Sequence, residues 1–590
     1  MGMKTEPILY SLTPYDPAGH RFRIEMRIPR PNHEGQQLTL PAWIPGSYLI
    51  RDFSRQIETI VARCAGKPVT VTKTGNHSWQ CAPCKGALHI EYTVYAWDLS
   101  VRGAHFDETH AFFNGTSVFL CPTGLEASPC LLHLQPPAHA RNWKVYTSLP
   151  LASGRSAAAR RHGFGLYEAP DYDALIDHPV EMGTPQVARF TACGAEHELV
   201  FTGVVPNLDL KRITADVKKI CEAQIALFEP STLRAPFLDS ADRYVFMTMV
   251  VGDGYGGLEH RASTALMASR RDLPTIGRAD TGEAYENFLG LVSHEYFHTW
   301  NVKRIKPAAF APYDLTRENH TRLLWVFEGF TSYYDDLMLL RSGVIDQKNY
   351  LSRLAKTISA VHRGPGRFKQ STADSSFDAW TRFYKQDENS PNALVSYYAK
   401  GSLIAAGLDM LIRRESKGQK SLDDVMRLMW TRYGRDFYPS GGTGVAEDAL
   451  PGLVLEATGV DAAPFIARHA EGIEDVPLES LLASQGISLS WKPASDAPTL
   501  DIRTRVVQNE VHLATVYEGG AGHEAGLSAG DILVAVDGLR VTRDSTLESL
   551  LASYQPGQTV TLHVFRRDEL RKFDALLRPA GPTECVLSVE

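Results

Sequence analysis

The chain has 590 residues, of which 44% are hydrophobic and 22% charged, and its formal net charge is −7 at pH 7. It is too long for one compact core, so we expect three or four domains. The mild charge is not gathered into blocks, which argues against nucleic acid or an anionic membrane as the main partner. No apolar run reaches the roughly 20 residues of a membrane span, and the N-terminal stretch lacks the apolar core of a signal peptide.

The first part of the chain is a series of short strands. Segments such as RFRIEMRIP (21–29) and HIEYTVYAW (89–97) alternate apolar and polar residues and are separated by Gly, Pro and Asn turns. This pattern predicts an all-β domain of sandwich type, to which we assign residues 1–195.

The eight cysteines do not make a disulfide scaffold in so long a chain. Cys81 and Cys84 have the spacing of a redox motif or of half a zinc knuckle, but no second such pair completes a knuckle. We therefore expect ordinary thiols and a cytoplasmic location, with a periplasmic or secreted location left open.

The pattern changes near residue 205. DLKRITADVKKICEAQIALFE (209–229) has helical periodicity, RYVFMTMVVGDG (243–254) is typical of a strand that ends in glycines, and long helical patterns dominate from about 281 to 475. We expect a small strand-rich lobe followed by a mainly helical lobe, together forming an α+β domain over residues 196–478.

The last hundred residues return to strands. AGLSAGDILVAVDGLRV (525–541) resembles the central run of a PDZ domain, and we assign residues 479–590 to such a domain. Gly486-Ile487-Ser488-Leu489 is a candidate for its carboxylate-binding loop. Substrate binding, a lid and a homo-oligomer contact all stay open as its role.

The stretch His294-Glu295-Tyr296-Phe297-His298 fits HExxH on a helix. Residues four apart share a helix face, so both histidines can bind one zinc ion. Glu295 lies beside them, placed to take a proton from the attacking water. Taken alone, the motif is also compatible with a helix that carries two partly exposed histidines.

A third ligand separates the classes of zinc peptidase. The metzincin pattern requires Gly and His where this chain has Asn301 and Arg304, which excludes that class. Glu328 lies in an apolar helical stretch, where a carboxylate without a partner is costly and a zinc ion supplies one. We predict Glu328 as the third ligand; the competing candidates, in a polar connection, are Asp314, Glu318 and His320.

These motifs resemble the gluzincin clan, and most closely the glycyl aminopeptidase family, peptidase family M61. The resemblance rests on HEYFHTWNVKRIKP (294–307) and WVFEGFTSYY (325–334), and it extends to WIPGSYLIRDFSRQI (43–57), VRGAHFDETHAFFNGTSVF (101–119) and GYGGLEHRAS (254–263). It implies a thermolysin-like catalytic domain and a preference for N-terminal Gly or Ala. Many gluzincins orient the first zinc histidine with an acid where this chain has Ser332, so Asp335, one turn further, is our candidate for that task.

The resemblance also implies further site residues. GGLEH is similar to a segment whose Glu binds the substrate α-amine, which points to Glu259, with Gly256 and Gly257 allowing close approach. Tyr398 in YAKG matches the tyrosine that donates to the oxyanion, with Tyr397 adjacent to it. Peptides are then the substrates.

Two other functions stay open beside a zinc aminopeptidase. One is a zinc endopeptidase whose PDZ domain recruits peptide C-termini. The other is a catalytically inert protein that binds peptides through the PDZ domain. Cleavage that requires a free α-amine separates the first of these from an aminopeptidase.

Overall fold

The computed structural model describes residues 6–278 and 282–589. The chain divides into two compact units, one made of residues 1–319, 334–345 and 426–446 and the other of 320–333, 346–425 and 447–590. The boundary passes through one continuous helical stretch, Trp325–Arg341. Each unit is described on its own below.

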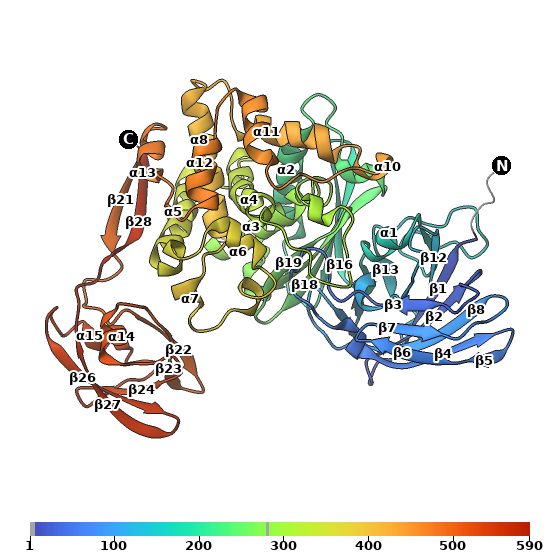
Figure 1. The fold of residues 1–590 in the computed structure, drawn as a ribbon, viewed down its shortest axis with the longest axis horizontal. Helices are drawn as coiled ribbons and strands as arrows, with labels where there is room; N and C mark the ends of the chain where they lie inside the picture. Colours follow the sequence, from blue (N-terminus) through green and yellow to red (C-terminus); the bar gives the residue numbers. More distant parts are fainter. Residues whose placement is uncertain (1–5, 279–281, 590) are drawn as a thin grey trace. The chain divides into compact units, whose positions relative to one another are not determined.

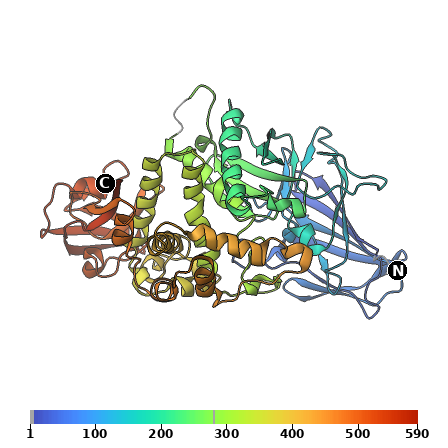
Figure 2. The same ribbon diagram turned by 90° about the horizontal axis from the view of Figure 1, so that it is seen from above.

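The predicted all-β domain is confirmed, and its strands are coloured blue to cyan in Figures 1 and 2. The largest sheet has the order β14-β12-β1-β2-β8-β4-β5, and two four-stranded sheets follow the orders β13-β15-β10-β9 and β11-β3-β7-β6. In β2, Phe22, Ile24, Met26 and Ile28 are all buried, because alternate residues face the core. The strands are β1 Ile8–Asp16, β2 Arg21–Ile28, β3 Gln37–Thr39, β4 Ile57–Cys64, β5 Lys67–Val69, β6 Val71–Gly75, β7 Ser78–Cys81, β8 Leu88–Tyr95, β9 Ala104–Phe106, β10 Ala111–Phe113, β11 Cys121–Pro122, β12 Cys130–Leu134, β13 Lys144–Tyr146, β14 Gly165–Ala169 and β15 Val180–Gly183, with one short helix, α1 Tyr172–Ile176.

A five-stranded sheet of order β16-β17-β18-β20-β19 follows in the same unit. Strands β17, β18 and β20 are parallel, whereas β16 and β19 are antiparallel edge strands. Helix α2 packs on β16, and α3 packs on β19 and β20 (Figure 1). The bounds are β16 Gln186–Ala192, β17 Ala195–Thr202, α2 Leu210–Phe228, β18 Arg243–Val251, β19 Tyr255–Glu259, β20 Ser263–Ser269 and α3 Gly282–Phe297.

One hydrophobic core joins this sheet to the β-domain. Val245, Met247 and Leu258 belong to the same buried cluster as Phe22, Ile24 and the other inward side chains of the N-terminal sheets. Loops of the N-terminal domain are therefore held in fixed positions against β19, which is the edge strand nearest the predicted site.

The second unit begins with helices. A π-helical turn, Trp325–Gly329, continues directly into α4, Phe330–Arg341. The glycines at 329 and 401 let this stretch approach α8 closely, since a Cβ at position 329 would lie 2.6 Å from the Cα of Gly401. The other helices are α5 Gln347–Arg363, α6 Thr372–Phe377, α7 Ser390–Ala393, α8 Ala399–Glu415, α9 Leu422–Met429, α10 Phe437–Ser440, α11 Ala449–Thr458, α12 Ala463–Ile466 and α13 Leu478–Ala483; α10 lies in the first unit, and α9 has residues in both.

The C-terminal PDZ prediction is confirmed, but its proposed carboxylate-binding loop is wrong. The PDZ sheet is built from β22 to β27 with its own apolar core, and α14 and α15 accompany it (Figure 1). Residues 487–489 instead lie in β21, which pairs only with β28 in a two-stranded ribbon that contacts α5. The bounds are β21 Ile487–Pro493, β22 Ile502–Val507, β23 Glu510–Val516, α14 Ala521–Ala525, β24 Ile532–Val536, β25 Leu539–Arg540, α15 Leu547–Leu551, β26 Thr559–Arg566, β27 Glu569–Leu576 and β28 Pro582–Val589.

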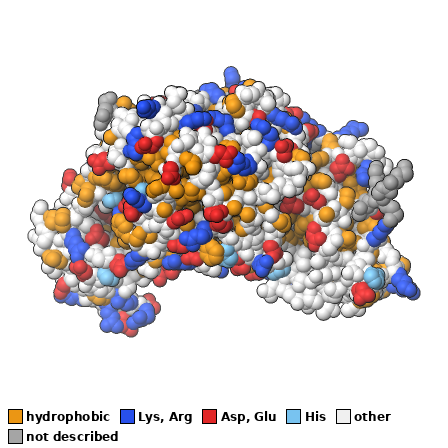
Figure 3. All heavy atoms as spheres, turned by 45° about the horizontal axis from the view of Figure 1, so that its top comes forward, with side chains coloured by type: hydrophobic (Ala, Val, Ile, Leu, Met, Phe, Trp, Pro, Cys, Tyr) orange, Lys and Arg blue, Asp and Glu red, His pale blue; other side chains and the backbone are white. Residues whose placement is uncertain are grey.

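The surface agrees with the even charge pattern of the sequence. Lys and Arg side chains mingle with Asp and Glu over the face shown in Figure 3. Among the described residues, no helix combines the length and apolarity needed to cross a membrane.

The cysteines are all free thiols, as expected. Burial, with a smaller contribution from Cys84, raises the pKa of the Cys81 thiol to about 11. This pKa does not fit the activated thiolate that a redox motif requires.

Candidate active site

Helix α3 brings the HExxH histidines together. The Nε2 atoms of His294 and His298 lie 3.0 Å apart. His298 Nδ1 lies 2.8 Å from the carbonyl oxygen of Asn301, and His294 Nδ1 lies 3.0 Å from Asp335 Oδ2. These acceptors favour the proton on Nδ1, so each ring turns an Nε2 lone pair toward one point. The interpretation of Asp335 as the acid that orients His294 is confirmed.

Glu328 lies on the helical stretch that also carries Asp335. It is 2% exposed in the π-helical turn, and Asp335 follows seven residues later in α4. One ligand atom from each of His294, His298 and Glu328 lies within 4.8 Å of the other two. Two imidazole nitrogens and a carboxylate oxygen are the donors of a catalytic zinc site, so these residues fit the ion that the motif predicts.

Glu259 ends β19 close to this motif. Its carboxylate is 4% exposed, and one ligand atom from each of Glu259, Glu295 and His298 lies within 4.8 Å of the others. Oε1 of Glu259 is buried and has no hydrogen-bond partner among the described residues. A buried carboxylate oxygen in this state is costly unless a ligand supplies the missing donor.

Two glycines are needed where the chain approaches these carboxylates. A Cβ at Gly257 would lie 2.1 Å from Oε1 of Glu295, and one at Gly46 would lie 2.4 Å from Oε2 of Glu259. Gly46 belongs to the N-terminal loop and has φ +91°, a conformation that favours glycine. The N-terminal domain therefore covers the end of β19 that carries Glu259.

A second buried carboxylate, Asp177, stabilises the backbone next to Glu259. It accepts from Lys303 Nζ at 2.7 Å and Arg261 Nε at 2.8 Å, and Nδ1 of His260 lies 3.1 Å from it. Burial alone raises the pKa of Asp177, but Lys303, His260 and Arg261 outweigh burial and hold that pKa well below its usual value. The sequence gave no sign of Asp177, because it lies in the β-domain far from the motifs.

His260 acquires a structural role from this cluster. It is 2% exposed, and burial lowers its pKa despite the hydrogen bond with Asp177. A neutral imidazole that bonds Asp177 orients the segment just after Glu259. Sequence comparison with relatives alone left this histidine without an assigned task.

Tyr398 precedes α8 in the second unit. Its hydroxyl lies 3.4 Å from that of Tyr384, and its ring is partly buried. The adjacent Tyr397 is fully buried, and burial raises its pKa well above the usual value. Tyr398 is therefore the better placed of the two tyrosines to reach a ligand.

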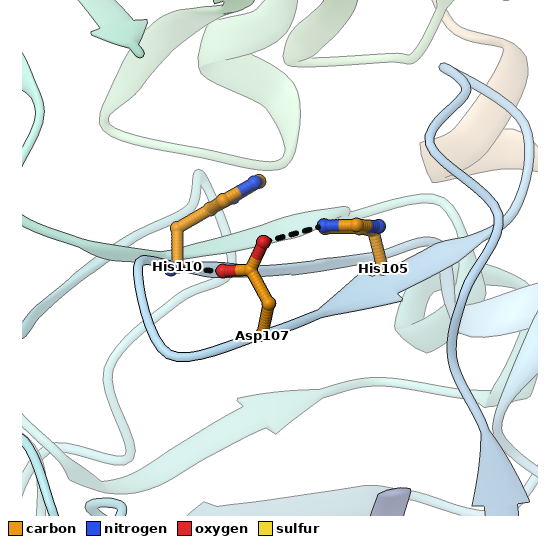
Figure 4. A group of neighbouring side chains, drawn as sticks. All are labelled: His105, Asp107 and His110. Atoms are coloured by element: carbon orange, nitrogen blue, oxygen red, sulfur yellow. Dashed lines mark hydrogen bonds and ion pairs between the residues drawn. The ribbon is translucent and has the colours of Figure 1, made fainter. Parts of the chain in front are cut away.

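Another group with metal-like spacing has a different explanation. His105, Asp107 and His110 lie together in the β9–β10 hairpin (Figure 4). Oδ1 of Asp107 accepts the backbone N–H groups of Thr109 and His110, while Oδ2 lies 3.2 Å from Nε2 of His105. The carboxylate thus closes the turn of the hairpin.

Comparison with known proteins agrees with this geometry. Family models match residues 9–184 (Peptidase M61 N-terminal domain), 287–404 (M61 glycyl aminopeptidase) and 498–577 (PDZ domain). No curated protein matches the chain.

Solved structures include a protein of the same length and fold. An aminopeptidase N family protein from Idiomarina loihiensis is 42% identical with a TM-score of 0.93, and the alignment covers 99% of this chain and 98% of that one. An M1 zinc metallopeptidase from Deinococcus radiodurans is 14% identical with a TM-score of 0.47, covering 80% and 95%, and no argument rests on it. The chain belongs to the M61 glycyl aminopeptidase family and is a peptidase with a C-terminal PDZ domain.

Proposed function

We propose that the chain is a zinc aminopeptidase that removes the N-terminal residue of peptides, with a preference for Gly or Ala. The observation that carries the proposal is the buried Oε1 of Glu259, which has no hydrogen-bond partner within the described residues and lies beside the HExxH motif. A substrate ammonium supplies both the missing donor and the opposite charge.

The covered end of β19 favours an exopeptidase. Because the Gly46 backbone packs against the Glu259 carboxylate, little space is left for substrate residues before the α-amine. An endopeptidase needs an open path on both sides of the scissile bond. The buried carboxylate therefore supports the aminopeptidase over the endopeptidase hypothesis.

We assign the chemistry as follows. His294, His298 and Glu328 hold one zinc ion, which supplies Lewis-acid polarisation of the scissile carbonyl when bound. Glu295 takes a proton from the attacking water and delivers it to the leaving amine. Tyr398 donates a hydrogen bond to the oxyanion. Glu259 fixes the α-amine, and Gly256 and Gly257 leave the β19 backbone accessible to the substrate.

The inert-binder hypothesis is weakened by the residues themselves. His294 and His298 each have an acceptor at Nδ1 that turns Nε2 toward the metal position, an arrangement that peptide binding by a PDZ domain does not require. The PDZ domain itself we assign to peptide binding, separately from the chemistry.

The test combines metal analysis with hydrolysis of glycyl and alanyl 4-nitroanilides. We expect about one zinc ion per chain and, for Glu295→Gln, a fall in kcat of roughly 1,000-fold with zinc retained, because the general base is lost. Glu318→Gln is the matched control, an exposed glutamate and a rival zinc ligand, and it should keep both zinc and activity. Unchanged kcat in Glu295→Gln would rule out the mechanism.

A further inference from the structure

A side chain of the N-terminal domain lies beside the substrate edge of the catalytic sheet. Nη1 of Arg102 lies 4.0 Å from the position of a Cβ on Gly256 in β19. Gly257, the next residue, turns its other face to Glu295. Because successive strand residues face opposite sides, Arg102 and Glu295 flank β19 from the two faces of the sheet.

The loop that carries Arg102 is rigidly built. Asn114, which is fully buried, donates from Nδ2 to the carbonyl oxygens of Val101 at 2.9 Å and Gly103 at 3.3 Å. The amide thus fixes the residues on both sides of Arg102. Asn114 directly follows the β9–β10 hairpin whose turn Asp107 closes (Figure 4), so hairpin and loop form one scaffold that presents the guanidinium.

The guanidinium lacks an internal partner. Nε of Arg102 is buried and has no hydrogen-bond partner within residues 6–278 and 282–589. A guanidinium N–H removed from water without an acceptor is costly, and a carboxylate is the group that matches its planar donors. This state points to an anionic group that arrives with a ligand.

The geometry of β19 says which part of a substrate that group belongs to. β19 is an edge strand, and a peptide whose amine is bound at Glu259 must run antiparallel to it, toward Gly256. Three strand residues span about 10 Å, which is close to the length of an extended tripeptide. The third residue of the substrate then lies opposite Gly256, and its side chain points to the face that Arg102 occupies.

We propose that Arg102 is a specificity-determining residue that binds a carboxylate on the third residue of the peptide substrate. The inference rests on the aminopeptidase function proposed above, because it takes the α-amine to be bound at Glu259. Two sources carry the same chemistry: the free C-terminus of a tripeptide, or an Asp or Glu side chain at that position. Di- and tripeptides, or peptides acidic at the third residue, form the corresponding substrate class.

The experiment uses the full chain and four peptides: Ala-Gly-Gly, Ala-Gly-Gly-amide, Ala-Gly-Glu-amide and Ala-Gly-Gln-amide. In the wild type we expect kcat/KM to be about ten-fold higher for the acid than for the first amide, or for the Glu than for the Gln peptide. The first ratio identifies the C-terminus as the carboxylate, and the second identifies the side chain. Arg102→Gln should bring the elevated ratio to about one.

Matched controls separate this inference from the proposed function. Arg63→Gln, on the exposed face of β4, should leave both ratios at their wild-type values. Hydrolysis of alanyl 4-nitroanilide, which has no third residue, reports the aminopeptidase function alone, and its absence in the wild type overturns that function. If the wild type cleaves the anilide but both ratios stay near one, or if Arg102→Gln keeps the elevated ratio, the role of Arg102 is overturned. Arg102→Lys, which keeps the charge, guards against a folding defect and should retain part of the ratio.

Discussion

Two buried carboxylates near the catalytic strand differ in how their charges are balanced. Asp177 is surrounded by Lys303, Arg261 and His260, whereas Oε1 of Glu259 has no hydrogen-bond partner in the part of the chain that the structure describes. Burial of a charge is tolerated when partners are present, and its cost is otherwise deferred until a ligand binds. The contrast separates a structural acid from one that we assign to substrate binding.

The largest expected effect is on the fully paired carboxylate. Asp177→Asn leaves Lys303 and Arg261 without their buried counter-charge, so we expect a loss of about 3–5 kcal/mol in the free energy of unfolding. Chemical denaturation of the two proteins measures it. Asp173→Asn is the control: its carboxylate also pairs with Arg261 but is 52% exposed, and it should cost less than about 1 kcal/mol. Equal losses in both variants would contradict the distinction.

Acid should remove the Asp177 contribution. Its pKa is depressed in the folded state, so the ion pairs stabilise the protein above the unfolded pKa of about 4 and are lost as the pH falls toward the folded value. The stability difference between wild type and Asp177→Asn should therefore be constant from pH 7 to about 5 and shrink below about pH 4. A difference that persists unchanged at pH 3 would show that the charge of Asp177 is not what stabilises the fold.

A smaller effect is expected at the loop that covers Glu259. Gly46→Ala places a Cβ against both carboxylate oxygens at 2.4 and 2.6 Å, so the carboxylate must shift, and we expect KM for alanyl substrates to rise about ten-fold. Gly66→Ala is the control, because Gly66 also has positive φ (+77°) but nothing lies within 4 Å of its Cβ position. It carries the same backbone strain of roughly 1 kcal/mol and should leave KM unchanged.

Local patterns carried much of this site into the sequence. HExxH needs only the helical repeat to bring two histidines onto one face, and the apolar run around Glu328 marks a buried carboxylate from composition alone. The PDZ domain was recognisable from one conserved-looking turn and strand. The all-β start followed from alternation of apolar and polar residues. The boundaries at residues 195 and 478 and the catalytic roles of the site residues stay predictions.

Long-range pairing accounts for what the sequence did not show. Gly486–Leu489 has a plausible loop sequence, but β21 pairs with β28 almost a hundred residues later, which no local pattern reveals. Gly46, Arg102 and Asp177 reach the catalytic strand only because the two β-regions share one core. The glycine with positive φ in WIPGSY was the one local sign that a close approach occurs there.

The most direct test of the central claim measures whether Glu259 recognises a free α-amine. Hydrolysis of Ala-Gly-Gly and its N-acetylated form is compared in the wild type and in Glu259→Gln, with released Gly-Gly as the readout. The account predicts that acetylation lowers kcat/KM at least 100-fold in the wild type, and that Glu259→Gln loses most of its activity on the free amine. Equal cleavage of the free and acetylated peptides by the wild type would contradict the account.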